Sequence, residues 1–459
     1  MTSATEAVKL RWILVAVSMA LFCVQIDYFA VNLALPRMAS ELDSTPTDLQ
    51  WVISVYMLTL GAFMLPAGRI GDIFGRRRTL LAGVALFGLA SALCALAPSA
   101  TLVIAFRALQ GLGAALIFPV SVSVLTNAFS AAWASHAIGL AYGIAGLGNA
   151  AGPLIGGLLT ETVGWRWIFW LNVPLTLVSL AIGAWSITES SDETVPRRID
   201  IAGLALVTIG IGFFTLTFDR APSWGWLSTS TAVAFAGSLA ALVVFVVVEN
   251  RVRWPLVDLS LVQIPRFTVL VIAGTIANIA YGVTIFLSTM YLQQVRGLDP
   301  LTAGLAFLGP SAGAALGGVL AGRLAASRPP VLVMGLTCVA AAVSLAALAA
   351  SQTWAVYLPS LTACGLTLGL VYAFTTVATQ AVVRSERAGE AAGVTLTALV
   401  TLAGVGVAVS GTVLEMLQRA GMSPDGAIDA IVAVLAALLL SAGAVVVLIA
   451  RASESGAET

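Results

Sequence analysis

Long apolar blocks recur along the whole chain, and its charged residues stand mostly between these blocks. Each block holds roughly 18–20 apolar residues, which is enough for a helix to cross a hydrocarbon core of about 30 Å. The blocks are continuously apolar, whereas the strands of a membrane barrel alternate between apolar and polar positions. The pattern therefore predicts an all-α polytopic membrane protein.

Fourteen spanning helices are predicted, and Gly or Pro marks most of the junctions between them. They cover residues 12–34, 50–68, 79–97, 101–125, 136–160, 166–187, 200–218, 231–248, 268–292, 301–323, 331–350, 354–379, 390–414 and 427–450. Composition fits this pattern, because 59% of the 459 residues are hydrophobic and 10% are charged.

The distribution of basic residues predicts the orientation. Sixteen of the 22 Lys and Arg residues fall at junctions on the side of the two termini, and five fall on the opposite side. Because cytoplasmic loops are enriched in Lys and Arg, both termini are predicted to be cytoplasmic. The first block lacks a small-residue cleavage site and is predicted to be a retained anchor. One Lys against 21 Arg suggests a GC-rich bacterial genome, and so a multi-pass protein of a bacterial cytoplasmic membrane.

Weak internal similarity indicates two related halves. Gly68-Arg69 recurs 254 residues later as Gly322-Arg323, and Gly111-Leu112 and Gly152 have counterparts at the same offset. The residues left over between the halves are enough for two more spans. The predicted organisation is a six-helix bundle over 1–190, two inserted helices with cytoplasmic linkers over 191–260, and a six-helix bundle with a short cytoplasmic tail over 261–459.

Asp27 and Arg107 are the leading candidates for function, because each interrupts an apolar block where a charge is costly. Arg107 shares a helix face with Gln110 and lies about 9 Å from the outer end of its span. Asp27 is at a similar depth, so an ion pair between the first and fourth spans is possible. The alternatives are an arginine that extends to the interface, a static structural pair, or an acid at the outer interface.

The loop after the second span reads Gly68-Arg-Ile-Gly71-Asp72-Ile-Phe-Gly75-Arg76-Arg77-Arg78. Its glycines allow a tight turn, and Asp72 can accept hydrogen bonds near the start of a helix. A positively charged cytoplasmic loop would explain the arginines alone. The spacing of the glycines and the Asp favours a gating latch built from Gly68, Asp72, Gly75, Arg76 and Arg77.

A second glycine motif, Gly148-Asn149-Ala-Ala-Gly152-Pro153-Leu-Ile-Gly156-Gly157, lies in the fifth span. Glycines four residues apart let another helix pack closely, and Pro153 permits a bend. Ordinary helix packing is the alternative, but the Gly-Pro pair followed by Gly156 and Gly157 is more specific and favours a conformational role.

These motifs together resemble those of the major facilitator superfamily, and in particular its fourteen-span drug:proton antiporter family. The resemblance rests on the loop around Asp72, on Arg107-Ala-Leu-Gln110-Gly111, on Gly148 to Gly157, and on Asp27-Tyr-Phe-Ala-Val-Asn32. It implies the major facilitator fold and favours exporters over importers. Phe29 stands where that family usually has Thr, which departs from its pattern of hydroxyl-assisted proton handling.

Further cavity candidates are polar or aromatic residues inside the predicted spans. Simple helix packing is the alternative for each of them. The substrate-cavity candidates are Asn32, Tyr56, Gln110, Phe118, Tyr142, Asn149, Asn278, Tyr281, Tyr372 and Thr376.

The function predicted is proton-coupled antiport that exports lipophilic drugs or toxic compounds across the cytoplasmic membrane. Asp27 is the one clear acid within the predicted spans, so monovalent cations or neutral molecules are the expected substrates. A dedicated exporter of one endogenous metabolite or antibiotic is the alternative, and a non-transporting receptor or scaffold is a weaker one. An enzyme is not predicted, since no paired carboxylates, metal cluster or activated nucleophile is evident.

No cofactor or metal is expected, because no nucleotide-binding loop is present and the proton gradient would supply the energy. The expected partners are small lipophilic substrates, protons and the lipid bilayer, without nucleic acid, and the chain is expected to act as a monomer.

Overall fold

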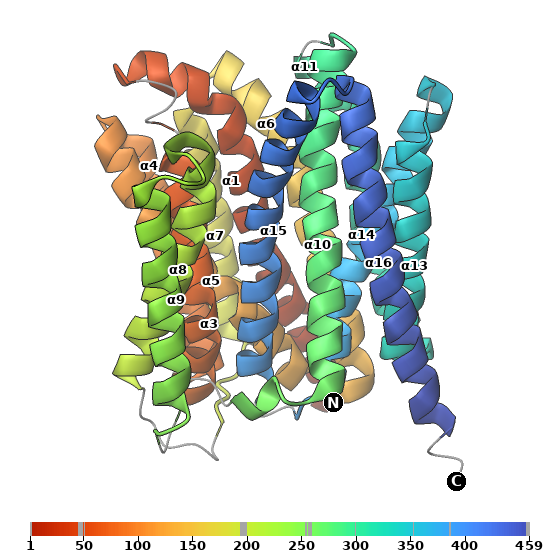
Figure 1. The fold of residues 1–459 in the computed structure, drawn as a ribbon. Coiled ribbons are helices and arrows are strands. Elements are labelled where there is room, and N and C mark those ends of the chain that lie inside the picture. The colour runs from red at the N-terminus through yellow and green to blue at the C-terminus, as the bar shows by residue number, and fades with distance from the viewer. Residues whose placement is uncertain are drawn as a thin grey trace.

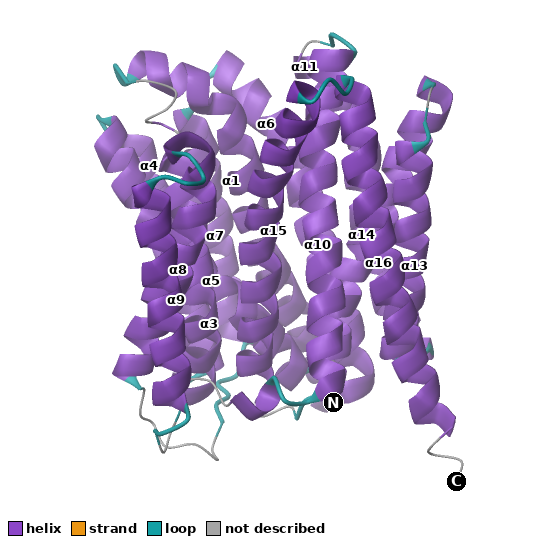
Figure 2. Ribbon diagram, viewed as in Figure 1, coloured by secondary structure: helices purple, strands orange, loops and turns teal. Residues whose placement is uncertain are grey.

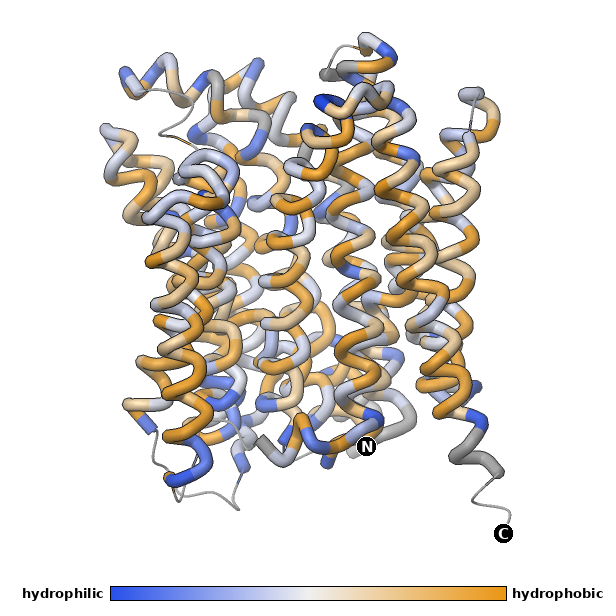
Figure 3. The backbone as a smooth tube through the Cα atoms, viewed as in Figure 1, coloured by the Kyte–Doolittle hydropathy of each residue, from blue (hydrophilic) through white to orange (hydrophobic). Residues whose placement is uncertain are grey.

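The computed structural model describes residues 2–44, 49, 51–192, 200–252, 255, 259–298, 300–351, 353–384 and 387–455. Within these ranges the chain is helical and contains no strand, and the helices stand side by side (Figures 1 and 2). Residues in the middle of the helices are mainly hydrophobic, and hydrophilic residues gather at the two ends (Figure 3). This arrangement satisfies backbone hydrogen bonds within each helix, as an apolar bilayer requires.

The first six long helices are α1 (Thr2–Glu41), α3 (Trp51–Phe74), α4 (Arg76–Leu96), α5 (Ala100–Ala128), α6 (Ala131–Thr162) and α7 (Arg166–Ser186). Two helices follow, α8 (Ile201–Trp224) and α9 (Thr229–Glu249). The remaining elements are η1 (Leu259–Leu261), α10 (Pro265–Met290), η2 (Tyr291–Val295), α11 (Pro300–Ala306), α12 (Leu308–Ser327), α13 (Pro330–Ala349), α14 (Trp354–Ala381), α15 (Ala388–Arg419) and α16 (Pro424–Ser455).

Among the described residues, thirteen helices are long and apolar enough to cross a membrane. The helix α6 is bent by 41° between Trp133–Asn149 and Leu154–Thr162, and it makes a fourteenth span if its two parts are taken together. The predicted all-α polytopic fold is therefore confirmed. The helix α1 is longer than predicted, because it continues to Glu41 beyond its apolar segment Val8–Asn32.

The helices differ in how much of their surface the protein itself covers. The apolar window of α5 is 78% buried, whereas that of α9 is 22% buried. The helix α5 is therefore central and α9 peripheral. The helix α8 packs against α9 on one side and against both α3 and α15 on the other.

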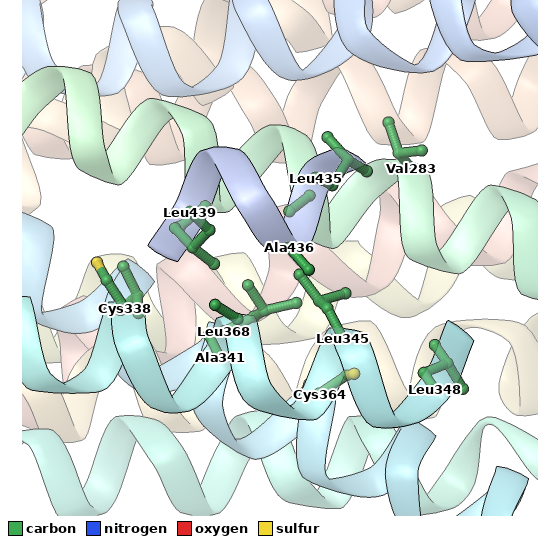
Figure 4. Packing of buried hydrophobic residues seen from close by; sticks show 14 of the residues in the cluster. Val283, Cys338, Ala341, Leu345, Leu348, Cys364, Leu368, Leu435, Ala436 and Leu439 are labelled. Atoms are coloured by element: carbon green, nitrogen blue, oxygen red, sulfur yellow. The ribbon is translucent and has the colours of Figure 1, made fainter. Parts of the chain in front are cut away.

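The helices of the second half enclose a core of their own. Leu345 of α13, Leu368 of α14 and Leu439 of α16 lie near one another in this core, to which Leu348 also belongs (Figure 4). Burial of apolar area does not drive association within lipid as it does in water, so this interdigitation stabilises the bundle through close contact.

Candidate functional site

Asp27 lies in the middle of α1 and is 1% exposed. The helix α5 brings two polar side chains to it from one helix face. Arg107 Nη1 forms an ion pair with Asp27 Oδ2, and Gln110 Nε2 donates to Asp27 Oδ1 over 2.9 Å. Arg107 Nη1 also donates to Gln110 Oε1 over 2.7 Å, so the three side chains form one connected network.

The helix α7 supplies a further donor to the same carboxylate. Asn172 Nδ2 donates to Asp27 Oδ1 over 2.8 Å, and both Asn172 and Asp27 are fully buried. Ser91 Oγ of α4 accepts from Gln110 Nε2 over 2.7 Å and donates to the Phe87 carbonyl. Side chains from α5 and α7 thus hold the Asp27 carboxylate of α1.

Arg107 has a second set of contacts that do not depend on Asp27. Its Nε donates to the Val52 carbonyl over 2.9 Å, and its guanidinium lies 4.1 Å from the centre of the Tyr56 ring. Arg107 Nη2 and the Tyr56 hydroxyl have no hydrogen-bond partner among the described residues. If Asp27 lost its charge, these contacts would still hold the arginine in place.

The glycines of the fifth span pack directly on the segment of α1 that carries Asp27. A Cβ added to Gly152 would lie 2.6 Å from Phe29 Cβ, and one on Gly156 would lie 2.7 Å from Ala30 Cα. A Cβ added to Gly148 would likewise lie too close to the Phe22 carbonyl. Gly157 is half-buried, and the side chain of Pro153 lies outside the described part of the chain. The Phe29 side chain of α1 thus packs against the backbone of α6 at Gly152.

The loop motif after α3 joins the two halves at the end that carries the termini. Asp72 is fully buried, and its Oδ1 accepts from Arg76 Nε over 2.9 Å. Its Oδ2 accepts from the backbone N–H of Glu390, in the first turn of α15, over 2.9 Å. The α15 N-cap residue, Arg387, makes no side-chain cap of its own, so Asp72 caps this helix from the other half.

Glycines make this junction possible. A Cβ on Gly68 would collide with the Gly389 backbone, and one on Gly389 would collide with the Asp72 carboxylate. Gly75 has a φ of 116°, which an L side chain rarely adopts. Arg77 continues the motif by donating from Nη2 to the Ala184 carbonyl over 2.6 Å, and its backbone N–H donates to Glu189.

A family model described as "Major Facilitator Superfamily" matches residues 17–408. The chain belongs to the major facilitator superfamily. It is therefore a membrane transporter that moves small substrates, and not an enzyme.

Several curated relatives of this transporter are resistance and export proteins of bacteria. It is 33% identical to multidrug resistance protein Stp of Mycobacterium tuberculosis over 418 residues, covering 90% of this chain and 77% of Stp. It is 32% identical to the tetracenomycin C resistance and export protein of Streptomyces glaucescens, again over 90% of this chain and 77% of the relative. The puromycin resistance protein pur8 of Streptomyces alboniger is 33% identical over 98% of this chain and 93% of its own.

A solved structure shows the same fold at low sequence identity. The human organic anion transporter MFSD10 superposes with a TM-score of 0.68 at 13% identity, covering 95% of this chain and 99% of its own. At this identity the likeness concerns the fold alone.

The cavity candidates occupy several different environments in the transporter. Tyr142 of α6 and Tyr372 of α14 meet edge to face across the two halves, with ring centres 5.5 Å apart. Phe118 is buried in the core of the first half, and the buried Thr376 hydroxyl has no partner among the described residues. These residues lie on or near the contact between the halves.

Other candidates are used for helix packing or remain half-buried. Asn278 donates to the Leu399 carbonyl of α15 over 2.8 Å, and exposed Asn32 donates to the Tyr28 carbonyl of its own helix. Asn149 and Tyr281 are half-buried, and Asn149 Oδ1 has no partner among the described residues.

Sequence reasoning did not select two residues that touch the Asp27 network, Asn172 and Ser91. The signal for Asn172 in the sequence is an amide inside the apolar segment that follows Arg166. Ser91 gave no comparable signal, because small hydroxyl residues are common in membrane helices. The contact of Gly139 and Gly143 of α6 with Gly322 and Gly318 of α12 was also not predicted.

Proposed function

We propose that this transporter is a proton-coupled antiporter that exports lipophilic compounds, monovalent cations or neutral molecules, out of a bacterial cell. The observation that carries the proposal is the buried Asp27 carboxylate, which is bound by Arg107, Gln110 and Asn172. A buried carboxylate that loses one of its donors becomes energetically costly to keep charged. Protonation of Asp27 is therefore linked to rearrangement of its donors.

Protonation of Asp27 removes the charge that balances Arg107. The arginine is then held by Gln110 Oε1, the Val52 carbonyl and the Tyr56 ring, and its positive charge is left without a counter-ion. Because both Asp27 oxygens accept protein hydrogen bonds, a cationic substrate reaches this carboxylate only when one donor moves away. Proton and substrate therefore compete for the same network, which is the requirement for exchange.

Movement of the halves would complete the cycle. Asp72 and the glycines around it hold α3 against α15 at the end of the termini, and glycines of α6 and α12 meet at the same end. Release of these contacts would open the site to that side. Proton re-entry supplies about 2.3 kcal/mol for each charge and each 100 mV of membrane potential.

The remaining parts of the proposal concern placement. Both termini are drawn at the same end of the molecule (Figure 1), and the basic residues gather at that end, which supports a cytoplasmic location. We also propose that residues 1–190 and 261–459 act as two moving bundles, with the helices of 191–260 inserted between them. The chain would work as a monomer in the bacterial cytoplasmic membrane.

The test is transport by the purified protein in proteoliposomes with an imposed pH gradient. Monovalent lipophilic dyes should move against their gradient, and collapse of the pH gradient should stop this movement. Flux that continues unchanged after the collapse would contradict proton coupling, and preference for a dication would contradict the proposed substrate class.

A second candidate is export of one endogenous antibiotic, which the similarity to the tetracenomycin C resistance and export protein favours. A panel of unrelated dyes and antibiotics separates the two. Movement of several classes supports broad export, whereas movement of a single compound supports the dedicated exporter.

A further inference from the structure

A cavity of about 280 Å³ lies among the second-half helices, at the end opposite the termini. Tyr291 of η2 and Tyr357 of α14 form one wall, with rings stacked 4.7 Å apart at 29°. Tyr357 is 5% exposed, and its hydroxyl lies beside Ser288, which also lines the cavity. Buried hydroxyl groups in the wall of a cavity suit a polar ligand.

Charges of both signs line this cavity. Asp425 and Asp429 stand one turn apart at the start of α16, so their carboxylates lie on one helix face. Neither has an ion-pair partner within 4.0 Å among the described residues. Arg296 lines the same cavity, and its Nε donates to the Tyr291 hydroxyl over 2.9 Å. The cavity therefore suits a headgroup that carries a cation and an anion.

An apolar groove of about 620 Å³ continues from this cavity between α13 and α16. Asp429 and Ala349 line both spaces, and the groove walls are mainly alanines such as Ala346, Ala350 and Ala433. It extends from the level of Ala342 to that of Ala350, which is about 12 Å along the helix.

The helix packing explains why the groove faces the lipid. The helices α13 and α16 approach closely at Gly335 and Gly443, and alanines leave space between them farther along. Their inner faces are filled by Leu345 and Leu439 of the core (Figure 4). Ala346 and Ala433 are exposed, so the groove opens on the outside of the bundle.

We propose that the cavity and the groove together bind one aminophospholipid from the leaflet opposite the termini. The ammonium group would bind Asp425 and Asp429, the phosphate would bind Arg296, and one acyl chain would occupy the alanine groove. Arg296 pairs with phosphate through several N–H donors, and a primary ammonium donates hydrogen bonds to carboxylates. This site is separate from Asp27 and does not depend on proton-driven export.

The aromatic residues favour ethanolamine over choline as the headgroup. Quaternary ammonium groups are usually bound against open aromatic faces. Here the Arg296 guanidinium lies 5.2 Å from the centres of both the Tyr291 and the Trp354 rings and already occupies that position. Asp425 already accepts a hydrogen bond from Ser423. Asp429, with the charge of Asp425 beside it, remains for a cation that can donate hydrogen bonds.

Native mass spectrometry of the purified full chain tests the headgroup. Phosphatidylethanolamine and phosphatidylcholine with identical acyl chains are added separately, and one bound phosphatidylethanolamine is expected with about tenfold tighter binding than phosphatidylcholine. Asp429→Asn should remove most of this preference. Glu415→Gln, a change to an exposed acid of α15, should keep it. Equal binding of the two lipids, or equal effects of the two substitutions, would overturn the proposal.

A pair of neighbouring alanines on α13 tests the groove. Ala346 lines it, whereas Ala347, which is also exposed, does not. Ala346→Phe should reduce bound phosphatidylethanolamine at least fivefold, and Ala347→Phe should leave it unchanged. If Ala346→Phe instead separates a dimer and leaves lipid binding intact, the groove is an interface between copies of the chain and the lipid proposal is wrong.

Discussion

A carboxylate with no exposed surface needs donors in place of the water it has lost. Arg107, Gln110 and Asn172 supply these donors to Asp27, and Ser91 supports Gln110. The arginine balances the charge, whereas the two amides fix the orientation of the carboxylate. Each donor is therefore expected to affect transport, but for a different reason.

Asn172 is expected to position Asp27 without binding the proton itself. Asn172→Leu removes one hydrogen bond to a charged group, and such a bond contributes about 1.5–3 kcal/mol. We expect pH-driven flux in proteoliposomes to fall about tenfold or more. Ser186→Ala is the control on the same helix, because that hydroxyl donates to the Ile182 carbonyl in its own helix. Equal flux in both variants would contradict the positioning role.

Glu41 connects the end of α1 to the start of α7 outside the apolar segments. A hydrogen bond from Arg37, together with one from Trp165, holds the pKa of the Glu41 carboxyl below its usual value of 4.5. Its stabilising effect is therefore present above that value and is lost as the pH falls through the lowered pKa.

Glu41→Gln should accordingly lower the Tm by about 1–2 °C at pH 7, because a partly exposed ion pair contributes at most about 1 kcal/mol. The difference from the unchanged protein should disappear near pH 3. Thermal unfolding in detergent at the two pH values measures this. A difference of the same size at both would show that the charge of Glu41 is not responsible.

At the scale of elements, the start of α15 is capped by a carboxylate from the other half of the chain. The cap is available only while Gly68 and Gly389 let α3 and α15 touch. The helix dipole and the Asp72 charge attract each other, so this contact favours the closed arrangement at the end of the termini.

Gly389→Ala places a methyl group against the Asp72 carboxylate and should separate these helix ends. We expect transport to fall at least tenfold while the protein still inserts and folds. Labelling of a cysteine placed at Ala388 should become faster, since Ala388 is buried in the closed arrangement. Gly237→Ala on α9 is the matched control, because no neighbouring atom of the described residues lies within 4 Å of its added Cβ. Unchanged labelling in Gly389→Ala would contradict the latch.

The sequence was sufficient to predict the elements and some of the site. Apolar blocks gave the spans, because a bilayer core fixes their length, and the depths of Asp27 and Arg107 allowed their contact to be anticipated. The partner of Asp72 was not predictable, because it is a backbone N–H of α15 and every residue except Pro carries such a group. Ser91 and Asn172 were missed for a related reason: the rotation of each helix about its axis depends on packing.

At the scale of the whole molecule, two seams join the halves toward the end of the termini. One is α3 with α15, and the other is α6 with α12, where Gly143 and Gly318 allow backbone contact. Close contact at both seams means that the halves must separate there if the site is to open toward that end. Of the two inserted helices, α8 contacts α3 and α15 beside the first seam, and α9 packs on α8.

A reversible cross-link of the second seam tests this motion. A Cβ on Gly146 would lie 3.5 Å from Ala315 Cα, which suits a disulfide between Gly146→Cys and Ala315→Cys. Oxidation should stop pH-driven transport, and reduction should restore it. Each single-cysteine variant should transport under both conditions. Full transport by the oxidised double variant would show that this seam does not open during the cycle.

The central claim is that Asp27 carries the proton that is exchanged for substrate. Asp27→Asn keeps the size of the side chain and can still accept a hydrogen bond, but it can no longer bind and release a proton. Wild-type and variant proteins are compared in proteoliposomes for uphill dye transport driven by a pH gradient and for dye exchange without one. We predict that the variant loses the first and retains measurable exchange. Uphill transport by Asp27→Asn at the wild-type rate would contradict the claim.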